Sequence, residues 1–126
     1  MTIEIASESG NYVFDVCQAA TAPGTPVVGY KPHGNTNQKF SVKENRIFSV
    51  HSGLVIDADV NNGRIIIAEK SKSINQLWFF QDDGSIRNAH NQCITLVTSN
   101  DKGGDLYLQP WSGKSNQKWR VVTTPL

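Results

Sequence analysis

Short apolar stretches alternate with polar, turn-rich stretches along the whole of this 126-residue chain. The apolar stretches are rich in Val, Ile, Leu, Tyr and Phe, which favour strands, while Gly, Pro, Asn and Asp gather between them. No window shows the apolar period of an amphipathic helix over more than about two turns. The pattern therefore predicts an all-β protein.

One short motif divides the expected strands into three groups. Asn-Gln-x-aromatic occurs at Asn37–Phe40, Asn75–Trp78 and Asn116–Trp119, so its Gln residues are separated by 38 (76 − 38) and 41 (117 − 76) positions. An internal period of this size is typical of repeat architectures. Alignment on the motif gives three units, at about residues 1–42, 43–83 and 84–126, within a single domain.

The units share one order of segments. An apolar strand ("YVFDVC" from Tyr12, "LVIDAD" from Leu54, "QCITLV" from Gln92) is followed by a turn-rich loop and a second strand ("PVVGY", "RIIIAE", "DLYLQ"). The strand with the motif comes next, and we expect a short fourth strand after it, such as "RIFSV" from Arg46 or "SIRNA" from Ser85. One such unit cannot bury its apolar side alone, so three are expected to close on one another with pseudo-threefold symmetry.

The residues of the motif have different expected roles. An aromatic side chain at the same place in every unit is what a shared core requires, so Phe40, Trp78 and Trp119 are predicted to be buried. The preceding Asn and Gln need hydrogen-bond partners if they are buried, and backbone or a ligand could supply them.

Charge narrows the possible functions. Lys and Arg number 12 and Asp and Glu number 11, for a net charge of +1, which argues against nucleic acid as a partner. The pairs Lys39/Lys43 and Lys70/Lys72 are predicted to be solvated surface.

Targeting signals and cysteine usage bear on where the protein works. The first ten residues lack a basic region followed by an apolar stretch, and no segment approaches the roughly 18 apolar residues of a membrane span. Cys17 and Cys93 are the only cysteines, fewer than a small disulfide-dependent domain carries. We therefore expect a cytoplasmic protein that does not insert into membranes. If it leaves the cell, we expect an unconventional export route.

The three motifs, spaced by about 40 residues in one β-rich domain, resemble the Q-x-W repeats of ricin-B-type lectins, which are β-trefoil carbohydrate-binding domains. Asp15 and Asp57 stand at the Asp position of that family in two units. The segment "VVGYKPHGNTNQKF" is similar to the Gly-aromatic-x-x-His-Gly-x-x-Asn-Gln segment of cytoplasmic mushroom lectins. The resemblance implies a β-trefoil of three four-stranded repeats. It also implies a non-catalytic lectin that recognises terminal galactose or N-acetylgalactosamine on glycoproteins or glycolipids, with a role in defence.

Sugar recognition explains why the first unit stands out. A galactose-like ring has an apolar face that packs on an aromatic ring, and its neighbouring hydroxyls suit an ionised carboxylate, which only accepts hydrogen bonds. We expect Asp15 to accept from two hydroxyls, Tyr30 to stack on the ring and Asn37 to bond a hydroxyl. Alternatively, Asp15 caps a turn and Tyr30 is an ordinary strand aromatic.

Three further residues complete the candidate site. His33 and Gly34 follow Tyr30 on a loop, where a side chain or a backbone N–H could reach another hydroxyl, although His33 could equally be a solvated turn residue. The resemblance assigns Gln38 the task of orienting Asp15.

The third unit is a candidate for a weaker second site. It keeps Trp111, Asn116 and Gln117, but Thr95 replaces the Asp, and a neutral hydroxyl makes a weaker hydrogen bond than a carboxylate. Trp111 could instead anchor a partner chain.

The second unit is predicted to be structural. It keeps Asp57, Asn75 and Gln76, but alignment on Gly63 places Glu69 opposite Tyr30 and leaves no aromatic for stacking.

No catalytic constellation is visible in the sequence. Cys17 and Cys93 lie in apolar, strand-like stretches typical of buried, inert thiols. The histidines His33, His51 and His90 lack metal-ligand spacing, so neither a metal nor a cofactor is expected.

The main alternative to a lectin is a β-trefoil that inhibits proteases or binds another protein, since fold does not fix function. A carbohydrate-binding module detached from a larger enzyme is a third possibility. If a single shallow site binds sugar weakly, a second site or a homodimer would supply avidity.

Overall fold

The computed structural model describes residues 1–124, with side chains at all of these positions except 98, 99 and 124. Its strands are β1 (Thr2–Ser7), β2 (Val13–Val16), β3 (Val27–Tyr30), β4 (Phe40–Lys43), β5 (Arg46–Ser49), β6 (Val55–Ala58), β7 (Ile65–Ala68), β8 (Phe79–Phe80), β9 (Ile86–Arg87), β10 (Cys93–Asn100), β11 (Gly103–Gln109) and β12 (Trp119–Thr124). Short 3-10 turns form η1 (Cys17–Ala19), η2 (Thr36–Gln38), η3 (Ile74–Gln76) and η4 (Ser115–Gln117). The all-β prediction is confirmed: the described residues form no α-helix, and none of their segments is a helix able to cross a membrane.

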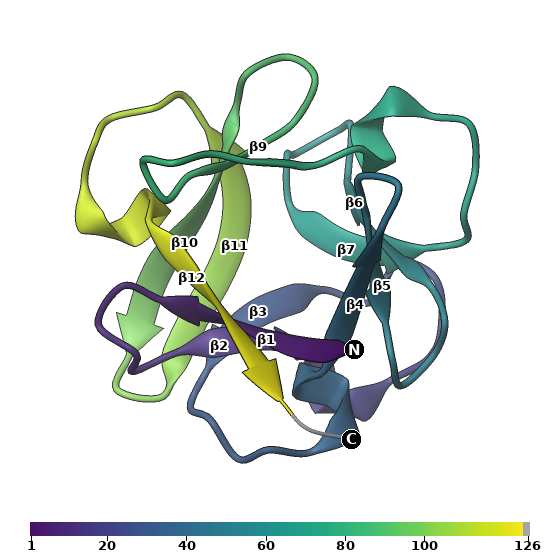
Figure 1. Cartoon of the computed structure of the whole chain (residues 1–126), viewed down its shortest axis with the longest axis horizontal. Helices are drawn as coiled ribbons and strands as arrows, with labels where there is room; N and C mark the ends of the chain where they lie inside the picture. The colour runs from purple at the N-terminus through teal and green to yellow at the C-terminus, as the bar shows by residue number, and fades with distance from the viewer. Residues whose placement is uncertain (125–126) are drawn as a thin grey trace.

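Four strands fall in each of the three units, and all the pairings are antiparallel. The hairpins β2–β3, β6–β7 and β10–β11 surround a common centre, as Figure 1 shows, with β1, β4 and β12 crossing near the middle of the view. The connected order is β7-β6-β5-β4-β1-β2-β3-β11-β10-β9-β8, and β12 pairs with β1. This arrangement has the pseudo-threefold symmetry that the repeated motif predicted, and it is the β-trefoil that the resemblance to ricin-B-type lectins implied.

One strand assignment from the sequence was wrong. The segments "RIFSV" and "SIRNA" form β5 and β9, which open units two and three instead of closing the units before them. The strand that follows each motif is the fourth, and β4 turns directly into β5 through Glu44 and Asn45. Both residues have positive φ, 53° and 62°, as a tight two-residue hairpin turn requires.

The motif aromatics are buried in the core, as predicted. Phe40, Trp78 and Trp119 are at most 7% exposed, and Phe14 contacts Phe40 and Trp119 edge-on at centroid distances of 6.3 and 4.8 Å. The two indoles also donate to backbone carbonyls of strands β6 and β10, Trp78 to Ile56 and Trp119 to Ile94, each at 3.0 Å. Each Trp thus fills the core and ties its motif to the second strand of its own unit.

The third hairpin is longer than the other two and reaches the first unit. Strand β11 pairs with β10 along its whole length and uses its other edge, from Gly103 to Asp105, to pair with β3, with Gly103 opposite Tyr30. Gly103 has φ +144°, and a Cβ there would overlap the carbonyl of Gly29, so only glycine lets the strands come this close. Strand β3, which carries Tyr30, is therefore held on both edges, by β2 and by β11.

Candidate functional site

Asp15 is the centre of a buried polar network in the first unit. It lies on β2 and is 4% exposed, and the 3-10 turn η2 brings two amide side chains to it. Asn37 Nδ2 donates to Asp15 Oδ1 at 3.2 Å, and Gln38 Nε2 donates to Asp15 Oδ2 at 2.9 Å. Both carboxylate oxygens are thus fixed in direction by partners from the motif.

Gln38 uses all of its polar atoms to hold this geometry. Its Nε2 also donates to the carbonyl of Lys31 at 3.0 Å, while its Oε1 accepts from the backbone N–H groups of His33 (2.9 Å) and Gly34 (3.2 Å). Because it is fully buried and fully bonded, Gln38 pins the loop after β3 to the second strand. The N–H of Gly34 is already engaged in this brace.

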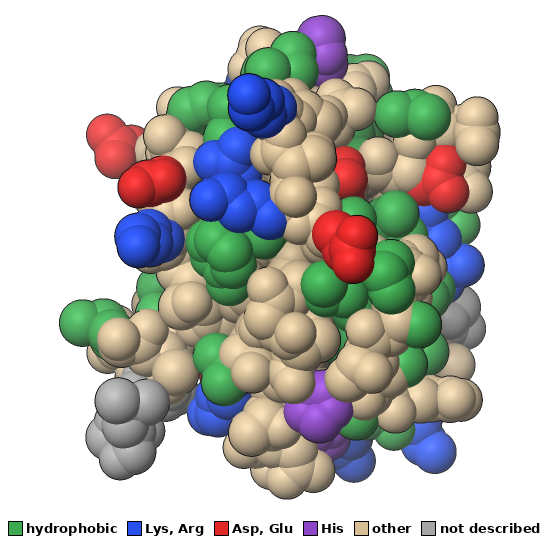
Figure 2. Space-filling view, turned by 90° about the vertical axis from the view of Figure 1, so that its right-hand side faces the viewer, with side chains coloured by type: hydrophobic (Ala, Val, Ile, Leu, Met, Phe, Trp, Pro, Cys, Tyr) green, Lys and Arg blue, Asp and Glu red, His purple; other side chains and the backbone are tan. Residues whose placement is uncertain are grey.

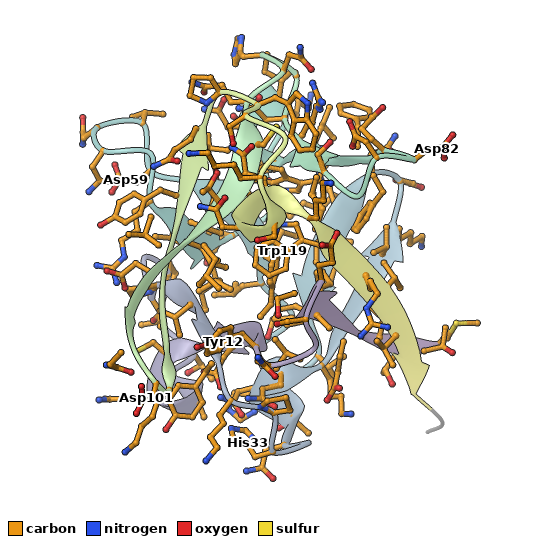
Figure 3. The ribbon with its side chains drawn as sticks, turned by 90° about the vertical axis from the view of Figure 1, so that its left-hand side faces the viewer. Tyr12, His33, Asp59, Asp82, Asp101 and Trp119 are labelled. Carbon is orange, nitrogen blue, oxygen red and sulfur yellow. The ribbon has the colours of Figure 1, made fainter. Side chains whose placement is uncertain are left out.

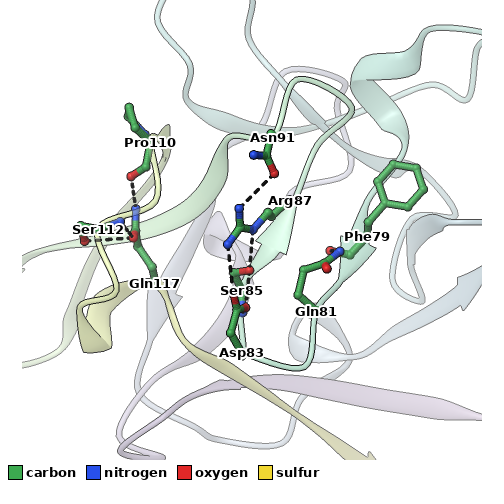
Figure 4. Close-up of polar contacts among 9 residues, drawn as sticks. All are labelled: Phe79, Gln81, Asp83, Ser85, Arg87, Asn91, Pro110, Ser112 and Gln117. Carbon is green, nitrogen blue, oxygen red and sulfur yellow. Dashed lines mark hydrogen bonds and ion pairs between the residues drawn. The ribbon is translucent and has the colours of Figure 1, made fainter.

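The same brace recurs in the other units. Gln76 Nε2 donates to Asp57 Oδ2 at 3.1 Å and its Oε1 accepts from the N–H of Ser71 at 2.8 Å. Gln117 Nε2 donates to Thr95 Oγ1 at 3.0 Å and to the carbonyl of Pro110, and its Oε1 accepts from Ser112, as Figure 4 shows for the latter two. The Gln of the motif is therefore structural in every unit, and only the acceptor on the second strand changes.

Asn37 contributes an acceptor to the first unit. Its Nδ2 donates to both Asp15 Oδ1 and, at 3.1 Å, the carbonyl of Val16, which uses both amide hydrogens. The side-chain oxygen of Asn37 remains for a hydroxyl donor.

His33 lies between the carboxylate and Tyr30. Its Nδ1 accepts from the N–H of Asn35 at 3.1 Å, which assigns the proton of the neutral ring to Nε2. This Nε2 is 3.4 Å from Asp15 Oδ2, and the His33 ring meets that of Tyr30 at a centroid distance of 6.2 Å. Figure 3 shows His33 at the same end of the molecule as Asp101, which follows β10.

The environment of Asp15 changes its acidity. Burial raises the pKa of its carboxyl above the ordinary value of 3.8, because water no longer solvates the charge. Hydrogen bonds from Gln38, the nearby His33 and the amide of Asn37 oppose this rise and favour the ionised form.

A pocket of about 520 Å³ opens above this network. Asp15, Tyr30, His33 and Asn37 all line it, and the Tyr30 side of it is accessible because this residue is 37% exposed. Gln38 and Gly34 do not line the pocket. The pocket thus combines a carboxylate, an amide oxygen and an aromatic face within one concave surface.

Sequence reasoning missed part of the pocket wall. Cys17, Gln18 and Ala19 of η1 also line it, and Cys17 is partly exposed, which corrects the expectation of a buried, inert thiol. The sequence stretch from Tyr12 to Cys17 was expected to be one strand, in which Asp15 and Cys17, two positions apart, would share a face, and this spacing could have signalled the contact. Gln18 and Ala19 both have φ 55°, a left-handed conformation that neither residue type announces.

The candidate sugar-binding residues of the third unit are arranged differently from those of the first. The guanidinium of Arg87 lies 5.0 Å from the centroid of the Trp111 ring, and Asp83, Ser85 and Asn91 hold this arginine in place (Figure 4). The strand register puts Gln109, two residues before Trp111, at the place of Tyr30.

The remaining residues of that candidate site face elsewhere. Asn116 Nδ2 donates to the carbonyl of Leu96 at 3.3 Å, and Asn116 lines a small hollow of about 150 Å³ together with Tyr12 and Trp119. Trp111 does not line this hollow.

The second unit has no aromatic at the stacking position, as predicted, but that position lies one residue before the one the sequence alignment gave. Ala68 pairs with Val55 as Tyr30 pairs with Val13, so Ala68 corresponds to Tyr30 and the earlier placement of Glu69 there was wrong. The alignment on Gly63 was displaced because the loops before the two strands differ in length.

The carboxylate, the brace and the repeated strands together point to one family. A sequence profile of the ricin-type beta-trefoil lectin domain matches residues 1–119. The chain belongs to this family. Search of the curated proteins finds no match for the lectin domain.

Solved structures show the same fold over the whole lectin domain. The C-terminal half of the earthworm R-type lectin, solved with GalNAc, is 19% identical with a TM-score of 0.84, covering 96% of this chain and 97% of that one. The designed threefold-symmetric protein ThreeFoil is 21% identical with a TM-score of 0.82, covering 98% and 99%. The agglutinin from Abrus precatorius is 22% identical with a TM-score of 0.85; the lectin domain spans 48% of its chain. At these identities the likeness establishes the fold.

The described residues contain no group of three His, Cys, Asp or Glu side chains placed to hold a metal ion.

Proposed function

We propose that this lectin domain binds glycans ending in galactose or N-acetylgalactosamine, through the pocket of the first unit. The observation that carries the proposal is the convergence of Asp15, Tyr30 and Asn37 on that pocket. The apolar face of the sugar would pack on Tyr30, and two neighbouring hydroxyls would donate to the Asp15 carboxylate and the Asn37 side-chain oxygen. The GalNAc bound by the structurally similar earthworm lectin supports this choice of sugar.

The other units lack part of this set. Unit two has the carboxylate of Asp57 but Ala68 in place of the aromatic. Unit three has Thr95 in place of the carboxylate. One shallow site gives an affinity on the order of millimolar to micromolar, so a homodimer or a weaker site in unit three would raise avidity on a glycan-bearing surface.

A glycan array and a galactose column test the proposal. We expect signals confined to glycans with terminal galactose or N-acetylgalactosamine, and retention on the column with release by free lactose. Absence of retention, together with inhibition of a serine or cysteine protease, would instead support the protein-binding alternative.

The raised pKa of Asp15 predicts the pH dependence of sugar binding. The ionised carboxylate is the acceptor, so affinity should fall on acidification, beginning at a pH above that expected for an ordinary carboxyl. The folded state binds this proton more tightly than the unfolded chain does. The stability linked to Asp15 is therefore full below the unfolded pKa and lost as the pH rises through the folded pKa, so its protonation does not itself unfold the protein. Galactoside titrations between about pH 7 and pH 4, with tryptophan fluorescence as the folding control, would show this; constant affinity would contradict it.

The position of Cys17 predicts protection of a thiol by sugar. Cys17 is accessible in the pocket, whereas Cys93 is fully buried and burial raises the pKa of its thiol, so one of the two should react quickly with an alkylating agent. A galactoside at ten times its Kd should slow this reaction about tenfold, because about one site in eleven stays free. The Cys17→Ser variant should lack the fast phase; equal rates with and without galactoside would contradict the location of the site.

A further inference from the structure

A second pocket, also of about 520 Å³, lies away from the sugar site. It is formed by the β4–β5 hairpin and by the loop after β7, and its wall includes Lys43, Arg46 and Lys70. Figure 2 faces the side of the molecule that carries these strands and shows Lys and Arg side chains gathered over its upper part, beside hydrophobic side chains. No residue of the pocket in the first unit lines this one.

The charges of this pocket are not balanced. Lys43, Arg46 and Lys70 face a single acidic lining residue, Glu44, and in the described part of the chain none of the three cations forms an ion pair. Other cations of the same part of the chain, such as Lys39 with Glu4 at 3.0 Å, do have carboxylate partners. Three like charges around one hollow repel one another, and a bound anion would relieve that repulsion.

Two polar side chains at the pocket have unused hydrogen-bonding capacity. Arg46 is held by one bond from Nη2 to the carbonyl of Ser71 at 3.0 Å, while its buried Nε has no partner among the described residues. Ser49 is 1% exposed, and its Oγ likewise lacks a partner within residues 1–124. Buried groups in this state are rare in native proteins, and a fixed guanidinium is the preferred group for binding an oxyanion.

The shape of the pocket indicates more than a bare ion. Its volume falls in the range of small-molecule sites, and the partly buried ring of Phe48 gives it an apolar wall. Lys43 and Arg46 are paired across the turn of the β4–β5 hairpin, and Lys70 comes from the loop after β7, so cations face the pocket from both segments that form it. The terminal oxygens of a sulfate or phosphate ester could accept hydrogen bonds from more than one of them. We propose that this pocket binds such an ester carried by a sugar, with Phe48 against the ring and Lys43, Arg46 and Lys70 around the anionic group.

Backbone NMR titrations at constant ionic strength test the proposal with five probes: glucose, inorganic sulfate, inorganic phosphate, glucose 6-sulfate and glucose 6-phosphate. Glucose and its esters are used because the site proposed in the first unit prefers galactose, so these probes should not occupy it. We expect saturable shifts at Lys43, Arg46 and Lys70 with a 6-ester and none with glucose. The Kd of the ester should be several-fold below that of the corresponding free anion, because the sugar adds the contact with Phe48. The tighter of the two esters identifies whether sulfate or phosphate is the source.

Matched variants separate this pocket from general charge. Lys43→Gln/Lys70→Gln should raise the Kd of the ester about tenfold or more, while Lys102→Gln/Lys114→Gln, with the same net charge, should leave it unchanged. Asp15→Ala should also leave it unchanged, so failure here is distinguishable from failure of the galactose site. Equal Kd values for the two double variants, or equal binding of ester and free anion, would overturn the proposal.

Discussion

Asp15→Ala is expected to weaken galactoside binding at least about 100-fold, which is roughly 2.7 kcal/mol. Among the described residues that line the pocket, Asp15 is the only carboxylate, so the substitution removes the charge-assisted hydrogen bond proposed for a sugar hydroxyl. One such bond contributes about 1.5–3 kcal/mol. It also leaves the side-chain amides of Asn37 and Gln38 without their shared acceptor, so the remaining groups lose their fixed directions. Isothermal titration calorimetry with methyl β-galactoside would measure the change.

Asp57→Ala is the matched control, because Asp57 has the equivalent place and the same Gln brace in unit two. It should leave galactoside affinity within about twofold of the wild type, since unit two has no stacking aromatic. Asp15→Asn keeps the volume of the side chain and separates the charge from the shape. Equal affinities for the wild type and Asp15→Ala, or a loss in Asp57→Ala alone, would show that the sugar is bound elsewhere.

Trp78→Ala is expected to destabilise the fold by about 3–5 kcal/mol, the typical cost of removing a buried Trp. The indole is 1% exposed in the core, and its Nε1 bond to the carbonyl of Ile56 would be lost as well. Unfolding in urea, followed by circular dichroism, would report the change in the free energy of unfolding.

Trp78→Phe distinguishes the two contributions of this side chain. The first unit has Phe40 at the same place, so a Phe fits the repeat and only the indole edge and its hydrogen bond are removed. We expect a loss of about 1–2 kcal/mol. If Trp78→Ala cost no more than Trp78→Phe, the motif aromatics could not be the shared core of the three units.

The fold could be predicted because the same pattern of strands and the Asn-Gln-x-aromatic motif occur three times in the sequence. The period of the Gln residues, the motif aromatics and the turn residues between apolar stretches all agree, and agreement across levels is what specifies a structure. The order of strands at the unit boundaries was harder to predict. The tight turn at Glu44–Asn45 joins β4 and β5 without a longer Gly- or Pro-rich loop between them. The segment that forms β5 was therefore assigned to the end of unit one instead of the beginning of unit two.

The site was only partly visible in the sequence. Asp15 and Asn37 could be proposed because sugar chemistry demands an acceptor pair. In the structure Asn37 donates directly to one oxygen of Asp15, and Gln38 donates to the other. The parts of the site that depend on the shape of a loop or on pairing between distant strands could not be predicted from the sequence. Strand β11 meets β3 beside Tyr30, although its sequence lies in another unit.

Lys43 and Lys70 illustrate the same limit. Each belongs to a local pair that predicts only solvated surface. Their convergence with Arg46 around one pocket is a consequence of how β4, β5 and the loop after β7 fold together.

The threefold repeat provides its own control for the central claim. The backbone N–H groups of His33, Ser71 and Ser112 make the same bond to the Gln of their respective units, so they report on three equivalent places. Nitrogen–proton correlation spectra during a titration with methyl β-galactoside are therefore the most direct measurement. The N–H signal of His33 should shift along a saturable curve while those of Ser71 and Ser112 stay constant. A shift at Ser71 or Ser112 without one at His33 would contradict galactoside binding in the first unit.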